Sequence, residues 1–150
     1  VDGAYAVGLH LHHLVELNVM DCNLMDDGVI GMVNHFSPSS HSSLRNLNLC
    51  ANNMTDVSGI AVCDAIENVF PLDHNDLPNF FVLGLGANND LSVGTTLAVE
   101  LLLRDRKGFQ VAMDKGDDGS GQMQRKEDCD ESKFNEMLKK FPPSKFNGGK

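Results

Sequence analysis

The sequence predicts an α/β fold, with short parallel strands in one layer and helices in the other. In residues 44–66, Leu47 and Leu49 alternate as in a half-buried strand, and Asn52 and Asn53 follow as a turn. After Gly59 the apolar residues change to helical spacing. The same strand–turn–helix pattern occurs upstream and downstream. One such unit cannot bury its apolar face alone, so we expect adjacent units to stack.

The chain begins with a segment that matches the helix of a unit whose strand is missing. Residues 1–7 resemble residues 27–30 and 57–60, where a glycine opens a helix. We therefore expect the chain to start inside a longer array. An uncapped end exposes apolar surface, which further repeats or a partner would cover.

Three units follow in register. Each places three apolar residues before an Asn or Cys, then an apolar residue, a glycine and a helical apolar face. The positions are Leu14, Leu17, Val19, Cys22, Leu24, Gly28, Val29, Ile30, Val33 and Phe36 in the first unit; Leu44, Leu47, Leu49, Asn52, Met54, Gly59, Ile60, Val62, Cys63 and Ile66 in the second; and Phe80, Leu83, Leu85, Asn88, Leu91, Gly94, Leu97, Val99 and Leu101–Leu103 in the third.

This spacing, L-x-x-L-x-L-x-x-N/C, resembles the leucine-rich repeat over residues 1–114. The glycine-opened helix and the long repeat are most similar to the ribonuclease-inhibitor-like subfamily. The resemblance implies a solenoid of three to four repeats, with parallel strands on the concave face and helices on the convex face. It also implies that Asn52, Asn88 and Asp114 turn inward and satisfy backbone groups where the chain leaves each strand.

Two polar insertions separate a helix from the next strand. Residues 37–43 and 71–79 are rich in serine, proline and aspartate, which predicts surface loops. A surface loop can be lengthened at little cost in free energy, which explains both insertions without a function. The alternative is that the two loops contact a neighbouring subunit.

The repeat pattern ends after Arg104. Residues 109–113 predict a fourth strand, and residues 115–129 form a linker rich in glycine and charge. Residues 130–150 form a C-terminal helix and tail, in which Phe134, Met137, Leu138 and Phe141 share one side. This helix either caps the solenoid or docks on a partner.

Charge and cysteine content limit the classes of function. The net charge of −9 argues against binding to nucleic acid or to an anionic membrane surface. No apolar run approaches the roughly 20 residues of a membrane span. Cys22 replaces the asparagine of the repeat and Cys63 falls on the apolar helix face. Both are interpreted as buried thiols, which favours a reducing cytoplasmic location over secretion.

No catalytic, cofactor, metal or small-molecule site is predicted. Residues 114–121 are similar to a calcium loop, but Gly116 and Arg125 stand where ligands are required. His10, His12 and His13 have no cysteine or carboxylate at ligand spacing, so we interpret them as surface histidines.

The resemblance also implies which residues would contact a partner, because residues flanking the inward leucines line the concave face. The alternative is that these positions merely face solvent. The candidate partner-binding residues are Glu16, Asn18, Met20, Arg45, Asn46, Asn48, Cys50, Phe81, Val82, Gly84 and Gly86.

The expected function is therefore non-catalytic: a protein–protein interaction or scaffold subunit of a larger intracellular assembly, for which cytoskeletal and ciliary complexes are the family analogy. The expected partners are other protein subunits. Two alternatives remain: a regulator similar to the Ran GTPase activators, and the repeat domain of a ligand sensor or ubiquitin-ligase receptor. An assay of stimulated GTP hydrolysis would test the first alternative. The sequence upstream of this chain would test the second, because the motifs of an effector domain would be visible there.

Overall fold

The computed structural model of the chain describes residues 3–6, 13–73, 77–88 and 90–113. Asp114, the predicted linker 115–129 and the predicted C-terminal helix and tail 130–150 lie outside the described residues, as do His10 and His12. The predicted loop 71–79 is described except for residues 74–76.

Four short strands form one parallel sheet. The strands are β1 (Glu16–Asn18), β2 (Asn46–Asn48), β3 (Phe81–Gly84) and β4 (Phe109–Ala112), and they lie in the order β1-β2-β3-β4. Leu47 of β2 pairs in register with Leu17 on one side and Leu83 on the other. The predicted parallel layer and its fourth strand are thus confirmed.

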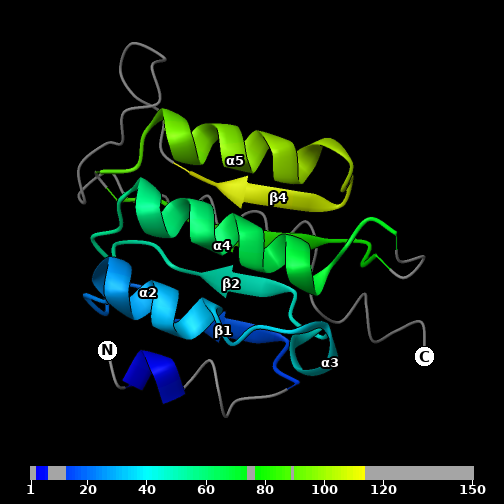
Figure 1. Ribbon diagram of the computed structural model, residues 1–150, viewed down its shortest axis with the longest axis horizontal. Helices are drawn as coiled ribbons and strands as arrows, with labels where there is room; N and C mark the ends of the chain where they lie inside the picture. Colours follow the sequence, from blue (N-terminus) through cyan, green and yellow to red (C-terminus); the bar gives the residue numbers. More distant parts are fainter. Residues whose placement is uncertain (1–2, 7–12, 74–76, 89, 114–150) are drawn as a thin grey trace.

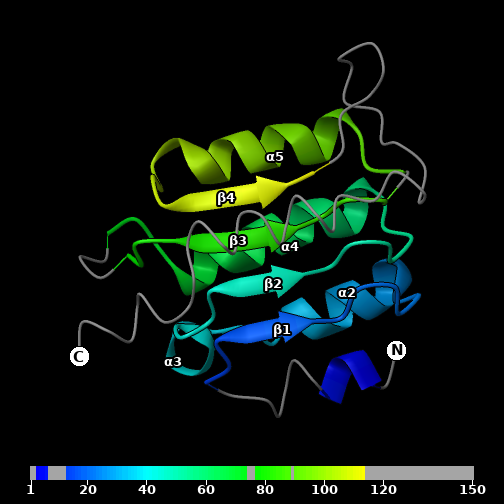
Figure 2. The ribbon, with the colours of Figure 1, turned by 180° about the vertical axis from the view of Figure 1, so that it is seen from behind.

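The helices lie on one side of this sheet. Between consecutive strands run α2 (Met25–Val33) with α3 (Pro38–His41), then α4 (Asp56–Val69), then α5 (Val93–Arg104). Helices α2, α4 and α5 lie side by side in front of the strands in Figure 1. Figure 2 looks onto the opposite face, which carries none of the helices named above and which we call the helix-free face. The fold is mixed α/β with a four-stranded parallel sheet.

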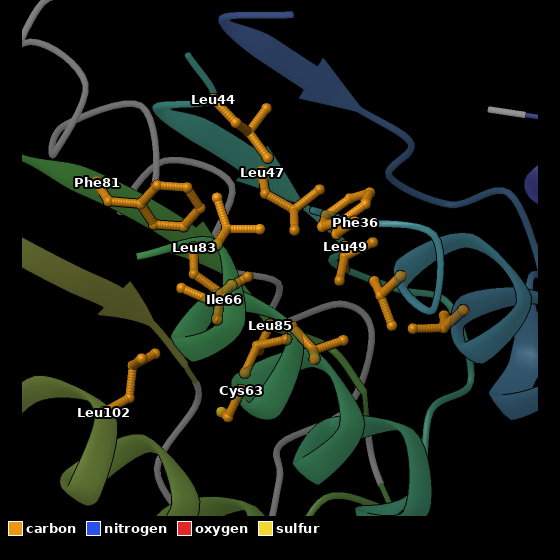
Figure 3. Close-up of a cluster of buried hydrophobic side chains, with 14 of the residues drawn as sticks. Phe36, Leu44, Leu47, Leu49, Cys63, Ile66, Phe81, Leu83, Leu85 and Leu102 are labelled. Atoms are coloured by element: carbon orange, nitrogen blue, oxygen red, sulfur yellow. The ribbon is translucent and has the colours of Figure 1, made fainter. Parts of the chain in front are cut away.

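Alternate residues of the strands build the core against the helices. Leu47, Leu49, Leu83 and Leu85 are fully buried and meet Ile66 and its neighbours from α4. Figure 3 shows these side chains converging between the sheet and the helix. Since side chains alternate between the two faces of a strand, the residues between these leucines belong to the helix-free face.

Residues 37–43 do not form the predicted loop throughout. Pro38 occupies the first turn of α3, and the Ser37 hydroxyl caps this helix by accepting from the backbone N–H of Ser40 at 3.3 Å. Such a cap and an initial proline both favour a helix start. His41 is buried, accepts from the Ser37 N–H through Nδ1 at 3.1 Å, and stacks on Phe36.

The chain leaves each of the first three strands by the same turn. Asp21, Ala51 and Ala87 have φ of 56°, 57° and 57°, in the left-handed region. Two of the three are alanines, for which this conformation costs roughly 1 kcal/mol. Equivalent backbone is therefore retained in three units, and in two of them the side chain does not favour it.

Expectations about burial were wrong at Cys22, at Ile60 of α4, which is 38% exposed, and along α5. Cys22 is exposed, whereas Cys63 is buried as predicted. On α5 the buried residues are Thr95, Val99 and Leu102, while Leu97 is 54% exposed and Leu101 is 55% exposed. Two stripes at helical spacing run along α5, and spacing alone does not show which of them faces the sheet.

Candidate interaction surfaces

Two buried asparagines link the turns of neighbouring units. The N–H groups of Cys22 and Leu24 donate to Asn52 Oδ1 at 3.1 and 3.2 Å, and those of Asn52 and Met54 donate to Asn88 Oδ1 at 2.8 and 3.1 Å. Each Nδ2 donates to backbone carbonyls of its own unit and of the preceding one. The carbonyls are those of Val19, Leu49 and Cys50 for Asn52, and of Leu49, Leu85 and Gly86 for Asn88. The predicted structural role of both asparagines is confirmed.

A second set of side-chain hydrogen bonds between units, which the sequence did not predict, joins the starts of the helices. Asp56 in the first turn of α4 accepts from the N–H of Ser92 at 2.9 Å, from the N–H of Thr95 at 3.0 Å and from both hydroxyls. One unit earlier, Asp26 accepts in the same way from the Thr55 N–H at 2.8 Å and from the hydroxyls of Thr55 and Ser58.

These hydrogen bonds change the acidity of both carboxyls. Burial, the largest influence, acts to raise the pKa of Asp56, but the hydrogen bonds from Ser92 and Thr95 together outweigh it and lower the pKa to about 2. The pKa of Asp26 is lowered by the same balance. Both carboxylates therefore act as structural acceptors between helices.

Four of the predicted partner-binding residues keep access to solvent. Glu16 and Asn18 of β1 are exposed, and Met20 and Arg45 are partly exposed. Asn18 Oδ1 accepts from the N–H of Met20 at 3.1 Å. Arg45 donates through Nη1 to the carbonyls of Ser42 and Leu44 and lies over the Phe70 ring, 5.8 Å from its centre.

Phe81 was wrongly assigned to the concave face. It lies in the core, where its ring stacks on Phe109 at 5.3 Å and meets the edge of Phe70 at 5.6 Å. Figure 3 shows it beside Leu83 and Leu47. Phe80 and Phe81 are adjacent, so either could have been the inward residue, and only the strand register decides between them.

The remaining candidates belong to the helix-free face, and they are buried. In and just after β2 these residues are Asn46, Asn48 and Cys50. In and just after β3 they are Val82, Gly84 and Gly86. Asn48 Oδ1 accepts from the N–H of Cys50 at 3.0 Å. Asn46 is fully buried, and neither its Oδ1 nor its Nδ2 has a hydrogen-bond partner among the described residues.

An apolar stripe that the sequence analysis did not single out as a surface runs along α5. Val93, Leu97 and Leu101 are each more than half exposed and are spaced by four residues, which places them on one side of the helix. A shallow hollow of about 640 Å³ runs beside the stripe. Its lining residues are Leu97, Glu100, Leu101, Leu103 and Arg104. Large exposed apolar patches mark contact surfaces more often than isolated apolar residues do.

Within the part of the chain that the structure describes, no three His, Cys, Asp or Glu side chains are grouped so that they could hold a metal ion. In the same residues, no helix has the length and apolar character to cross a membrane.

Comparisons with known proteins do not identify a family for the chain. No protein-family model, no curated protein and no solved structure matches the chain.

Proposed function

We propose that the described elements are successive repeats of a leucine-rich-repeat solenoid, similar to the ribonuclease-inhibitor-like subfamily, and that the chain is a non-catalytic interaction subunit of a larger intracellular assembly. The strand order, which follows the chain, and the single layer of helices support the repeat assignment. So does the recurrence of Asn52 and Asn88 at the same place in consecutive units.

The observation that carries the interaction role is the exposed stripe of α5. Val93, Leu97 and Leu101 leave large apolar side chains in water on a helix that packs against α4 on its other flank. Covering each such side chain with a partner removes apolar surface at about 25 cal/mol per Å². Glu100 and Arg104 border the stripe with opposite charges, which suits an apolar contact with a polar rim.

The test replaces the stripe without touching the core. An affinity-tagged chain carrying Leu97→Glu and Leu101→Glu is compared with wild type by quantitative mass spectrometry of the purified native complex. We expect at least one partner subunit to fall about tenfold or more, since two charges would be buried in the contact.

The matched control carries Val57→Glu and Leu72→Glu, which add the same charge at exposed apolar positions on and after α4. The control should retain its partners. Equal retention of every subunit by the α5 variant, at an unchanged melting temperature, would contradict the proposed role of the stripe.

We propose the helix-free face as a second protein-binding surface. Asn46 favours this assignment, because its buried amide has no partner in the part of the chain that the structure describes, and an unpaired buried polar group is costly. Gly84, which pairs in register with Asn48, and Gly86 add no side chain to this face.

A further inference from the structure

Consecutive helices pack through equivalent flanks, and counting from the N-caps identifies these flanks. Thr55 caps α4 and Ser92 caps α5. Asp56, the first residue of α4, accepts hydrogen bonds from α5 and its cap. Ile60, the fifth residue, also faces α5, because a Cβ on Gly94 would lie 3.4 Å from its Cδ1. The first and fifth positions of α4 therefore lie on the flank that contacts the next helix.

The corresponding flank of α5 points away from α4. Its first and fifth residues are Val93 and Leu97, and Leu101 follows one turn later. These are the three residues of the exposed stripe. Figure 1 shows α5 at the end of the helix layer, with α4 on one side of it only. The stripe therefore lies where a next helix would pack, and we call this side of α5 the outer flank.

The outer flank lacks the two features by which α4 holds its neighbour. Val93 stands at the position of Asp56, so no carboxylate is present there to accept hydrogen bonds from a following unit. Thr96 stands at the position of Gly59, the glycine through which α4 approaches α5 closely. The hydroxyl of Thr96 donates to the Ser92 carbonyl at the start of its own helix, at 3.1 Å. The outer flank therefore suits an occupant other than another unit of this kind.

The charge beside the stripe indicates the chemistry of that occupant. Glu100 and Arg104 line the shallow hollow next to the stripe. Arg104 is paired with Asp105 at 3.1 Å, whereas Glu100 makes no ion pair among the described residues. A basic residue of a partner would complement Glu100. The net charge of −9 also attracts a cationic partner and repels a second copy of the chain.

We propose that the outer flank of α5 binds a basic amphipathic helix of a partner protein, which lies along α5 as α5 lies along α4. The equivalent flank of α4 already packs against a helix, and the stripe continues that packing by one element. The apolar side of the partner helix covers the stripe, and its basic residues lie next to Glu100. This assignment rests on the proposed interaction role of the stripe and adds the kind of partner that it binds.

Two synthetic helical peptides of equal length test the assignment with the purified full chain. Both carry the same apolar side of leucine and alanine, and the polar side is lysine in one peptide and glutamate in the other. Fluorescence anisotropy at physiological salt measures the two dissociation constants. We expect the lysine peptide to bind at least about tenfold more tightly, since it alone complements Glu100 and the acidic chain. No measurable binding of the lysine peptide would overturn the proposal.

Neutral substitutions separate docking on the stripe from general attraction between a basic peptide and an acidic chain. Leu97→Gln with Leu101→Gln removes apolar contact area without changing the charge, and should weaken binding of the lysine peptide about tenfold. Val57→Gln with Leu72→Gln is the matched control at exposed apolar positions and should bind as wild type does. Equal binding by all three chains would indicate attraction by charge alone and would overturn the proposal.

Photocrosslinking in the native assembly distinguishes failure of this inference from failure of the proposed function. The crosslinking residue replaces Val93, Leu97 or Leu101 in three separate chains, and Val57 in a control chain. Two helices that lie side by side should give attachment sites that move by three or four residues from one variant to the next. The attachment sites should fall in one partner segment of net positive charge, and the control should not reach that segment.

The outcomes differ for the two hypotheses. Attachment to an acidic or extended segment of a partner would overturn the basic helix and leave the interaction role standing. Attachment within the same chain or to a second copy would also overturn the inference, because the occupant would be a different one. If no variant crosslinks to another protein, and Leu97→Glu with Leu101→Glu loses no subunit, the proposed function fails together with the inference.

Discussion

A single buried amide at Asn52 bonds the backbone of two units at once. Its Oδ1 accepts two N–H groups and its Nδ2 reaches three carbonyls, so one side chain bonds to five backbone groups. Cys22 stands at the equivalent place in the first unit, where its Sγ donates to the Met20 carbonyl at 3.5 Å.

Asn52→Leu should lower the free energy of unfolding by about 3 kcal/mol, because a leucine of similar volume satisfies none of these groups. Urea denaturation monitored by circular dichroism measures the change. Asn68→Ala is the control, since that exposed amide makes only one long bond, 3.4 Å to the Phe36 carbonyl, and should cost less than about 0.5 kcal/mol. A similar loss in the two variants would contradict the role assigned to Asn52.

At the scale of elements, the distance between helices is set by small residues. A Cβ on Gly59 would lie 2.2 Å from Thr95 Oγ1 and 3.0 Å from Leu91 Cδ2, so α4 approaches α5 closely only because this position has no side chain. Thr95 Oγ1 is also a donor to Asp56, at 2.6 Å. The glycine, the threonine and the aspartate together form one helix–helix joint.

Gly59→Ala and Gly31→Ala should have opposite effects on stability. Alanine favours a helix over glycine by about 1 kcal/mol, and at Gly31 no atom lies within 4 Å of the added carbon, so that variant should be stabilised by about 0.5–1 kcal/mol. At Gly59 the clash should reverse the sign and cost about 1–3 kcal/mol. Thermal unfolding of both variants against wild type measures the difference, and stabilisation by Gly59→Ala would refute this packing.

The elements also show what spacing alone predicts. The alternation of Leu47 and Leu49 predicted β2 and its inward side correctly, because apolar residues recur at every second position along a strand with one buried face. The exposure of Leu97 was not predictable in this way, because its burial depends on what lies outside α5. The helix joint did leave a pattern, an acidic residue at the first turn of two consecutive helices, as Asp26 and Asp56 show.

At the scale of the whole molecule, the two aspartates tie α2 to α4 and α4 to α5. A carboxyl whose pKa is lower in the folded chain stabilises the fold fully above its unfolded pKa, near 3.8 for Asp56, and loses that contribution as pH falls towards 2. For Asp56 the shift corresponds to up to about 2 kcal/mol. Asp26 adds to the effect in the same direction.

Asp56→Asn should therefore reduce the free energy of unfolding by about 1–2 kcal/mol near pH 6 and flatten its decline between pH 4 and pH 2. Denaturant titrations across this range measure both effects. Asp64→Asn, which removes an exposed carboxyl from the same helix, should change stability by less than about 0.5 kcal/mol. If wild type and Asp56→Asn lose stability in parallel on acidification, Asp56 does not form the acid-sensitive link.

The candidate surfaces were predicted less well than the fold, for a physical reason. Repeat spacing identifies the residues that face away from the leucines, and Asn46 and Val82 do lie on that face. Spacing does not report how much solvent exposure those side chains retain, and both are buried. Arg45 illustrates a second limit, because its side chain bonds to the carbonyls of Ser42 and Leu44 at the start of β2.

The strand order β1-β2-β3-β4 has a consequence for how the chain folds. Each strand pairs only with strands that are consecutive in sequence, and the side-chain hydrogen bonds between units join residues 28 to 39 positions apart. The entropy lost on closing a loop grows only with the logarithm of its length, so every added unit closes a loop of similar size and similar cost. The chain can therefore lengthen by whole units without making its slowest closure slower.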